Sequence, residues 1–357
     1  MKKNITIIIF VYILILNIMF FVLPKENYNE KENRYNSDFP TFTFRNLKSG
    51  NYTKEIESYI NDYFPLRNLF IMSKTNLDLL LLKEEVNNVF IKDNYLISKD
   101  NVKLENINKS ILKLNTFNKN ITSPISFILI PNNVYINRNL LSSYAPINNQ
   151  ELFKNFIFKK LENVVIVDVF NTLLEENNKR NLYYKTDHHY NIFGAFAVYK
   201  KYCEYMEIKC VDIENYKIKT VNNFKGSMYS KSGYFNHPGE IFYYIEDNDA
   251  GNVLYDYSNN TRLYFKENLV KKDKYKYFLG DNTRLVTIEN KNALYDKKIM
   301  LIKNSYGNSV VPFLVDTYSN VHVVDIRYFK ESLKDYVEKE NIEETIYLVD
   351  VAYLNQY

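Results

Sequence analysis

The most distinct feature of the hydrophobic pattern is a near-continuous apolar run at the start of the chain. It extends from Ile5 to Leu23 and follows Met1-Lys2-Lys3. As a helix it would measure about 28 Å, close to the hydrocarbon thickness of a bilayer. The two lysines favour a cytoplasmic N-terminus. A cleaved signal peptide is the alternative, but no small-x-small cleavage site follows Leu23. We therefore expect residues 1–24 to form an uncleaved signal anchor in the cell membrane, a single-pass helix with the C-terminal domain outside, at the cell surface.

The next segments change from polar to helical patterning. Residues 25–50, whose first part from Lys25 to Ser37 is charged and polar, are expected to form a juxtamembrane linker. From Asn51 to Lys83 apolar residues recur with helical spacing on either side of Pro65. Proline removes a backbone donor and ends a helix, so this stretch predicts two helices. Residues 51–357 as a whole are expected to form one catalytic domain.

The rest of the chain alternates between short apolar runs and helical patterns. The expected strands lie at 89–91, 95–97, 126–130, 164–169, 298–302, 321–324 and 345–349, and the expected helices at 107–118, 151–161, 191–205, 309–318 and 333–339. Uninterrupted apolar runs of this length are typical of strands buried on both faces. Strands that alternate with helices predict an α/β fold, a parallel sheet flanked by helices. Residues 211–297 have short β-prone runs and turn residues instead, and we interpret them as a β-rich insertion that leaves the sheet.

Composition narrows the function only by exclusion. The net charge is +4 and the lysines are interspersed with glutamates, so nothing indicates a nucleic-acid partner. Cys203 and Cys210 would lie roughly 10 Å apart on one continuous helix, too far for a disulfide. We expect free thiols unless the helix ends between them. No Cys/His cluster has the spacing of zinc ligands, and we expect no metal and no cofactor.

The first chemical candidate is Ser305. It follows the predicted strand 298–302 and precedes a predicted helix, which places a side chain at the carboxyl edge of a parallel sheet. Backbone N–H groups at the start of that helix would favour a developing oxyanion. A nucleophile is one interpretation. The other is a helix N-cap formed by Ser305 or Ser309, a common role for serine.

The second candidate is the stretch from Tyr184 to Asn191, which contains two of the four histidines of the chain. His189 would be the general base for Ser305, and Asp187 would orient its imidazole. The two-residue spacing requires the backbone to turn there. Asp187 or Thr186 could instead cap the following helix, and the adjacent histidines could be a buried pair. A metal site is less favoured because neighbouring side chains point in different directions and no third ligand is evident.

Three further positions follow from the same arrangement. A second oxyanion donor could be the backbone N–H of Gly280 or the side chain of Asn282, both near the start of the third buried strand. The stretch from Phe224 to Ser227 is a rival. For both stretches the alternative is a simple turn, which glycine and asparagine close together more often make. Arg327 follows the fourth strand, and it could bind a substrate carboxylate or simply pair with Asp325.

The ordered set of short motifs resembles one family. Thr186-Asp187-His188-His189-Tyr190-Asn191 resembles the signature of the DHHW family, which is similar to the alginate O-acetyltransferases and has an SGNH-hydrolase-like fold. The other pieces come in the family's order: Glu32-Asn33-Arg34, Asp62 to Arg67, Leu129-Ile130-Pro131, Asn304 to Ser309 and Asp325 to Phe329. The resemblance implies a triad of Ser305, His189 and Asp187.

The chain departs from the family pattern at two positions. Tyr190 stands where tryptophan is common, and Asn304 where aspartate is frequent. Tyr190 could pack over the histidine or stack on a sugar. With Arg327, we count Tyr190, His188 and Tyr306 as candidate substrate-binding residues. Asn304 removes a negative charge beside the nucleophile.

The expected function is an extracytoplasmic O-acetyltransferase that acts on a surface or secreted polysaccharide through an acyl-enzyme. The same triad with water as acceptor would make an acetylesterase. A non-catalytic protein that binds polysaccharide or holds a synthase complex together is the third possibility. The resemblance also implies as a partner a membrane-bound acyltransferase or a polysaccharide synthase complex.

Overall fold

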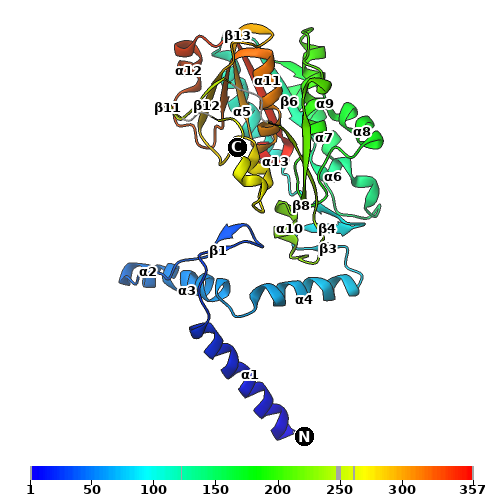
Figure 1. The fold of residues 1–357 in the computed structure, drawn as a ribbon. Coiled ribbons are helices and arrows are strands. Elements are labelled where there is room, and N and C mark those ends of the chain that lie inside the picture. The colour runs from blue at the N-terminus through cyan, green and yellow to red at the C-terminus, as the bar shows by residue number, and fades with distance from the viewer. Residues whose placement is uncertain (1, 122, 247–250, 260–261, 356–357) are drawn as a thin grey trace. The chain divides into compact units, whose positions relative to one another are not determined.

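The computed structural model describes residues 2–121, 123–246, 251–259 and 262–355 (Figure 1). The chain divides into two compact units. The first contains residues up to 87 together with 229–237, and the second contains residues 88–228 and 238–357.

The first unit contains the apolar N-terminal helix and the predicted helix pair. Its elements are α1 (Lys2–Val22), β1 (Tyr28–Asn29), β2 (Arg34–Tyr35), α2 (Phe44–Ser49), α3 (Asn51–Asp62), α4 (Arg67–Leu80) and β3 (Glu85–Val86). By length and composition, Asn4–Val22 could cross a membrane, and none of this stretch is buried. The predicted interruption at Pro65 is confirmed, because α3 ends before it and α4 begins after it.

An ion-pair network holds the polar segment after α1 to the two helices. The guanidinium of Arg34 binds both carboxylate oxygens of Asp62, and Glu32 binds Arg34 and Arg67. The hydrogen bonds from Arg34 hold the pKa of Asp62 well below its usual value. The two short motifs at Glu32–Arg34 and Asp62–Arg67 therefore contact each other, although about thirty residues separate them.

The second unit is built on one eight-stranded sheet, with the order β11-β10-β12-β14-β13-β15-β6-β7. Its strands are β6 (Ile125–Ile130), β7 (Val165–Val167), β10 (Asn252–Tyr255), β11 (Ser258–Asn259), β12 (Leu285–Glu289), β13 (Tyr295–Lys303), β14 (Tyr318–Val324) and β15 (Glu344–Asp350). The strands from β14 to β7 are parallel, and every residue of β6 and β15 is buried. Strands buried on both faces need helices on both sides, so the predicted α/β fold is confirmed.

Two groups of helices accompany this sheet. In one, α9 (Ile192–Tyr205) packs against α8 (Phe170–Lys179) and α11 (Val311–Thr317); in the other, α5 (Leu104–Lys119) packs against α7 (Gln150–Lys160) and α13 (Val351–Leu354). The other α-helices among the described residues after 88 are α6 (Asn133–Ile136), α10 (Ser227–Ser232) and α12 (Leu333–Glu340). Helix α8 was not expected from the hydrophobic pattern. The predicted strands at 89–91 and 95–97 are confirmed as β4 (Val89–Lys92) and β5 (Tyr95–Ser98), and the two pair as an antiparallel hairpin.

The insertion segment, residues 211–297, is rich in strands as expected, but only part of it leaves the sheet. Its first strands, β8 (Ile218–Phe224) and β9 (Glu240–Ile245), form a separate antiparallel hairpin. Further along, β10 and β12 rejoin the main sheet, and β12 pairs antiparallel with β14. The sheet is therefore larger than predicted, with an antiparallel extension on one side.

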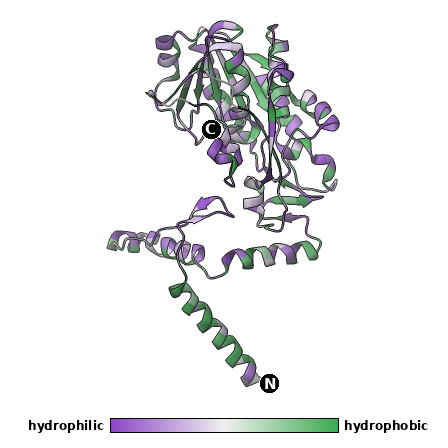
Figure 2. Ribbon diagram, viewed as in Figure 1, coloured by the Kyte–Doolittle hydropathy of each residue, from purple (hydrophilic) through white to green (hydrophobic). Residues whose placement is uncertain are grey.

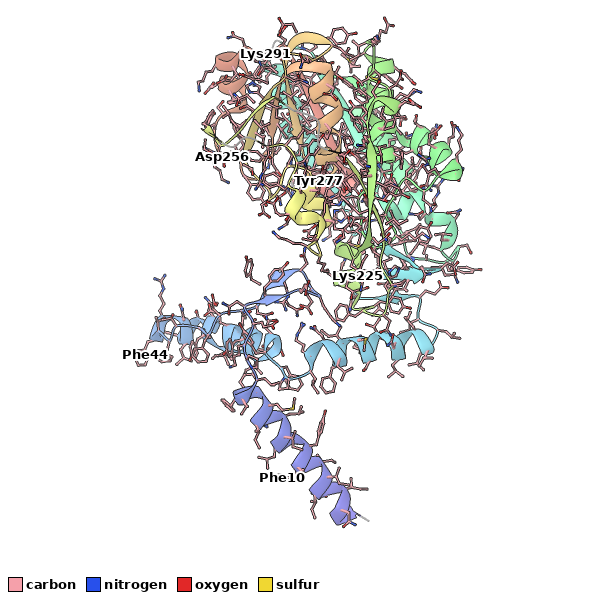
Figure 3. The ribbon with its side chains drawn as sticks, in the orientation of Figure 1. Phe10, Phe44, Lys225, Asp256, Tyr277 and Lys291 are labelled. Carbon is pink, nitrogen blue, oxygen red and sulfur yellow. A yellow bond between two sulfur atoms is a disulfide. The ribbon has the colours of Figure 1, made fainter. Side chains whose placement is uncertain are left out.

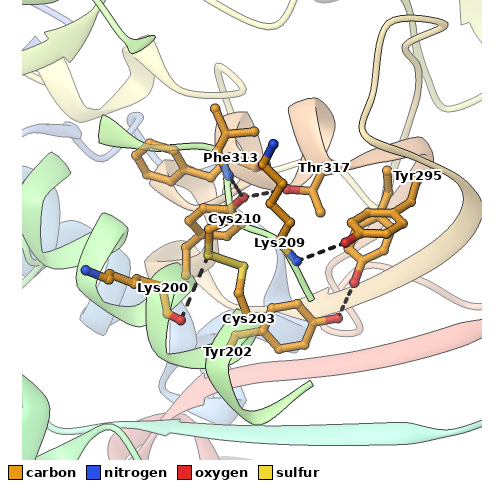
Figure 4. The surroundings of a disulfide bond; sticks show 11 residues. Lys200, Tyr202, Cys203, Lys209, Cys210, Tyr295, Phe313 and Thr317 are labelled. Carbon is orange, nitrogen blue, oxygen red and sulfur yellow. Dashed lines mark hydrogen bonds between the residues drawn. A yellow bond between two sulfur atoms is a disulfide. The ribbon is translucent and has the colours of Figure 1, made fainter. Parts of the chain in front are cut away.

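The expectation of free thiols is wrong. The structure has a disulfide between Cys203 and Cys210, whose Cα atoms are 5.9 Å apart (Figure 4). The two cysteines can meet because they do not lie on one continuous helix. Helix α9 ends at Tyr205, and the chain turns back before Cys210.

Candidate active site

Ser305 lies at the carboxyl end of the central strand β13. That strand pairs with β14 on one side and β15 on the other and ends at Lys303. Residues Ser305–Ser309 then form a 3₁₀ turn whose N-cap is Asn304, and the N-cap residue of the following α11 is Val310. Neither Ser305 nor Ser309 is an N-cap, which removes the alternative interpretation of this serine. The side chain of Ser305 is left at the edge of the sheet, half-buried.

The two stretches singled out in the sequence meet here. His189 Nε2 lies 2.7 Å from Ser305 Oγ, and His189 Nδ1 lies 2.5 Å from Asp187 Oδ1. Both His189 and Asp187 are buried. The three side chains thus form one hydrogen-bonded chain from carboxylate to imidazole to hydroxyl, the arrangement in which a histidine can take a proton from a serine.

A tight loop makes the two-residue spacing possible. Tyr183 and Tyr190 form an antiparallel bridge, and Tyr184 N–H donates to the carbonyl oxygen of His189 at 3.1 Å. Asp187 is at the tip of this loop, and its Oδ1 also accepts the backbone N–H of His189 at 2.9 Å. The N-cap of α9 is Asn191, so Asp187 and Thr186 do not cap that helix.

The insertion segment completes the environment of Asp187. Ser227 N–H donates to Asp187 Oδ2 at 2.7 Å. Gly226 lies so close that a Cβ on it would collide with the Asp187 carboxyl group. Burial alone would raise the pKa of Asp187, but the charged forms of His189 and His188 and the hydrogen bonds from His189 and Ser227 outweigh it and lower that pKa. Asp187 is therefore a carboxylate that keeps its charge while it orients the imidazole.

Glu240 on β9 holds the loop from the other side. One of its oxygens accepts both the N–H and the hydroxyl of Thr186, each at 2.6 Å, and the other accepts Lys185 N–H at 2.9 Å. Burial, together with the nearby charge of Asp187, raises the pKa of Glu240 to about 7 despite these hydrogen bonds. The sequence analysis missed this residue because 54 positions separate it from Thr186.

Aromatic side chains enclose the histidine. The ring of Tyr275 is stacked on His189, with centroids 3.9 Å apart and planes within 5°. Its hydroxyl donates to the carbonyl oxygen of Ser305 at 3.0 Å and lies 3.1 Å from Ser309 Oγ. Tyr275 therefore contacts both His189 and the turn that contains the candidate nucleophile.

Tyr190 and Tyr306 are placed differently from the prediction. Tyr190 is 0% exposed and Tyr306 1% exposed, so neither ring is open to a sugar. Tyr190 Oη donates to the carbonyl oxygen of Tyr306, and Tyr306 Oη donates to the carbonyl oxygen of His188, both at 2.7 Å. The candidate substrate-binding role is thus corrected to an internal one: these tyrosines tie the histidine loop to the serine turn.

His188 is the one residue of the signature pair with a partly exposed side chain. Its Nδ1 lies 2.7 Å from Ser227 Oγ, and its ring is 3.8 Å from that of His189. Ligand atoms of Asp187, His188 and His189 lie within 4.8 Å of one another, close enough for a metal. A metal there would compete with the bonds that already join Asp187, His189 and Ser305, so these donors suit the hydrogen-bonded chain better.

The remaining predicted residues lie apart from this chain. Gly280 is buried against the ring of Phe265, and Asn282 is exposed. Among the described residues, no hydrogen bond joins either of them to Ser305. The guanidinium of Arg327 makes two hydrogen bonds to Asp325, at 2.9 and 2.5 Å, so it pairs with Asp325, which was one of its two predicted roles.

Asp350 is a buried carboxyl group next to the serine turn that the sequence analysis did not identify. Asn304 Nδ2 donates to Asp350 Oδ1 at 2.6 Å, and Asn304 Oδ1 accepts Tyr306 N–H at 3.3 Å. Burial and the charge of Asp100 raise the pKa of Asp350 to about 6. Asn304 therefore links the turn that contains Ser305 to the end of β15.

Comparisons with known proteins agree with this architecture. A DHHW family protein from Eubacterium siraeum has a similar structure, with a TM-score of 0.67 and 23% identity over 76% of this chain and 96% of that one. Bacillus cereus PatB1 is also similar, with a TM-score of 0.63 and 21% identity over 74% and 96%, and another structure of PatB1 contains a sulfonyl adduct. No curated protein sequence matches the chain. The model of the family described as DHHW protein matches residues 97–324, well over half of the sequence, and the chain belongs to the DHHW family.

Proposed function

We propose that this protein is an extracytoplasmic O-acetyltransferase that acetylates a polysaccharide through an acyl-enzyme on Ser305. The observation that carries the proposal is the continuous chain from Asp187 through His189 to Ser305, with contacts of 2.5 and 2.7 Å. Family membership supports the choice of acyl group and acceptor, because the DHHW signature is similar to that of the alginate O-acetyltransferases.

The first half-reaction loads the enzyme. Ser305 Oγ forms a bond to the acetyl carbon while its proton passes to His189 Nε2. Asp187 stays ionised and stabilises the imidazolium through Nδ1–H. The tetrahedral intermediate then expels the donor's leaving group, which takes the proton from Nε2. Backbone N–H groups at the start of the serine turn are our candidates for stabilising the oxyanion.

The second half-reaction transfers the acetyl group. A sugar hydroxyl gives its proton to His189 Nε2 and attacks the acetyl carbon, and Ser305 Oγ leaves and recovers the proton. Water in place of the sugar would give an esterase. Exclusion of water and binding of the acceptor decide between the two reactions.

The proposed location follows from α1 and from the disulfide. We infer that α1 anchors the protein in the cell membrane with the second unit outside. The disulfide between Cys203 and Cys210 fits an oxidising compartment, where such bonds persist. In this setting an acetyl donor must be delivered across the membrane, and a membrane-bound acyltransferase or synthase complex is the partner that we propose.

Covalent labelling tests the nucleophile. The full chain in detergent micelles would be treated with a sulfonyl fluoride and analysed by intact mass and peptide mapping. We expect one adduct, on Ser305, with none in Ser305→Ala and much slower formation in His189→Ala. Ser143→Ala, at an exposed serine, is the matched control and should label like the natural protein. An adduct elsewhere, or equal labelling of Ser305 in His189→Ala, would contradict the proposed triad.

Turnover separates the three functions. Release of 4-nitrophenol from its acetate ester would be measured with and without soluble oligosaccharides, and the sugars analysed by mass spectrometry. Acetylated sugar that requires Ser305 would support the transferase. Ester hydrolysis without acetylated sugar would support the esterase, and background rates in all folded variants would support the binding protein.

A further inference from the structure

Helix α4 presents an apolar stripe to the solvent. The stripe consists of six side chains, each between 42% and 79% exposed: Leu66, Leu69, Phe70, Leu77, Leu80 and Leu81. The four residues that belong to the helix fall, together with the C-cap residue Leu81, within an arc of about 120° on a helix of 3.6 residues per turn, and Leu66 is the N-cap residue. The apolar residues of α4 are the green parts of this helix in Figure 2.

The stripe is not the face with which α4 packs onto its own unit. That contact is made by Thr75, which is 1% exposed and donates its hydroxyl to the carbonyl oxygen of Ser232 at 3.3 Å. Ile71 lies on the same side, where a Cβ on Gly233 would collide with it. At 100° per residue, Thr75 points almost directly away from the centre of the stripe. A helix that packs through one face and is apolar on the other has a second surface to cover.

The position of α4 in its unit indicates what covers the stripe. The end of α1 contacts α3 through Phe20, whose ring lies 6.4 Å from that of Tyr59, and Lys25 donates to Tyr59 Oη at 2.6 Å. Leu23 and Pro24 line the same cavity as residues 64–69, which include the start of α4. The end of α1 therefore lies beside the start of α4.

The exit point of a membrane helix lies at the boundary between hydrocarbon and headgroups. An apolar stripe that begins at this boundary and continues along a helix about 20 Å long is matched to the surface of a bilayer. Lys74 and Lys83 both pair with Asp78, which leaves a single net positive charge beside the stripe. Burial of apolar area then provides the attraction, at about 25 cal/mol per Å².

We propose that α4 lies in the outer surface of the same membrane that α1 crosses, with the six-residue stripe inserted among the acyl chains. The occupant of this surface is lipid. The proposal rests on the proposed anchoring by α1 and extends it, since a second contact with the bilayer would hold the first unit against the membrane instead of leaving it on a flexible tether.

Tryptophan fluorescence tests the proposal directly, because the natural chain has no tryptophan. The full chain would be reconstituted in phosphatidylcholine vesicles as three separate variants, each with a single tryptophan. Leu77→Trp reports on the stripe. Phe10→Trp reports on α1, where the side chain is 67% exposed and points away from the helix in Figure 3. Tyr144→Trp, at a position in the second unit that is 93% exposed, is the control for water.

The measurement is the loss of emission when the lipid is replaced by one brominated near the headgroup end of its acyl chains. We expect Leu77→Trp to lose emission and to shift to the blue, and Tyr144→Trp to do neither. Quenching of Phe10→Trp alone would overturn the proposal and leave the anchor intact. Absence of quenching in both Phe10→Trp and Leu77→Trp would overturn the anchor as well.

Two further outcomes would also refute lipid as the occupant. If Leu77→Trp is shielded from acrylamide but not quenched by bromine, protein covers the stripe, and a dependence on protein density in the vesicle would identify a second copy. If Tyr144→Trp is quenched as strongly as Leu77→Trp, the contact is not specific to the stripe.

Discussion

Replacing Asn304 by aspartate is the change that most directly tests the polar connection behind the serine turn. The Asn304 amide donates to Asp350 Oδ1 at 2.6 Å, so Asn304→Asp would place a second carboxyl group against a buried one. The natural Asp350 has a pKa of about 6, raised by burial and by Asp100. The variant can avoid two adjacent negative charges only by keeping one proton between them.

The magnitude follows from the titration of this pair. Two charges roughly 3 Å apart at an effective dielectric constant of about 20 repel each other by about 5 kcal/mol, equivalent to about four pKa units. The folded variant should therefore hold a proton to above pH 8, whereas the unfolded chain releases it near pH 4. Since the folded state then binds more protons than the unfolded state, stability falls as the pH rises. The natural Asp350 is half ionised at pH 6 and almost fully ionised at pH 8, so the natural protein loses only about 0.4 kcal/mol over this range, whereas the variant should lose about 2.7 kcal/mol.

Thermal unfolding of the full chain in micelles at pH 5, 6, 7 and 8 measures this loss. We expect Asn304→Asp to approach the natural protein at pH 5 and to melt about 5–10 °C lower than it at pH 8. The reciprocal variant Asn304→Asp/Asp350→Asn has one carboxyl and one amide again and should regain most of the stability at pH 8. A variant whose stability changes with pH as the natural protein does, or a double variant as pH-sensitive as the single one, would refute the reasoning.

Three other changes test the surroundings of the site and the disulfide. Gly226→Ala should push the Asp187 carboxyl group out of position and lower the turnover of 4-nitrophenyl acetate by about 100-fold or more, with little change in the circular dichroism spectrum. A normal turnover rate would contradict the close approach of Gly226 to Asp187. Asp187→Asn should lower turnover by about 10⁴, as the corresponding change does in serine proteases, with the fold intact; a loss below tenfold would argue against an orienting carboxylate. Cys203→Ser/Cys210→Ser should cost about 2 kcal/mol for this short loop, seen as a melting point about 5 °C lower that no longer responds to reductant; a reductant-sensitive variant would exclude the assigned pair.

The parallel strands β6, β13, β14 and β15 could be predicted because each contains a short apolar run that is buried on both faces. The run Ile125–Ile130 is an example, since all six residues are buried. The position of Ser305 followed from the same pattern, because parallel strands end at one edge. Helix α8 could not be found in this way. Of its residues only Phe170 and Leu173 are buried, too few to give a clear periodicity.

The disulfide and the two buried tyrosines show where local patterns stop being informative. Whether Cys203 and Cys210 can meet depends on where α9 ends, and the pattern of residues 191–205 does not specify this. The sequence allows Tyr190 to pack over the histidine or to stack on a sugar, and it makes Tyr306, next to Ser305, a candidate for substrate binding. Their hydroxyl groups instead satisfy backbone carbonyl oxygens in the interior, a pairing that depends on the tertiary fold.

The supports of the histidine loop also explain why the signature motif is not sufficient by itself. Four residues of the insertion segment contact this loop or His189. They are Ser227 through its N–H, Gly226 through its close approach, Glu240 through its carboxyl group and Tyr275 through its ring. Each of these contacts joins residues that are 39 or more positions apart, and no periodicity encodes them. The orientation of Asp187 and His189 therefore depends on the chain from 211 to 297. A member of the family that retained the signature but had a different insertion would need other donors for Asp187 to keep the same geometry.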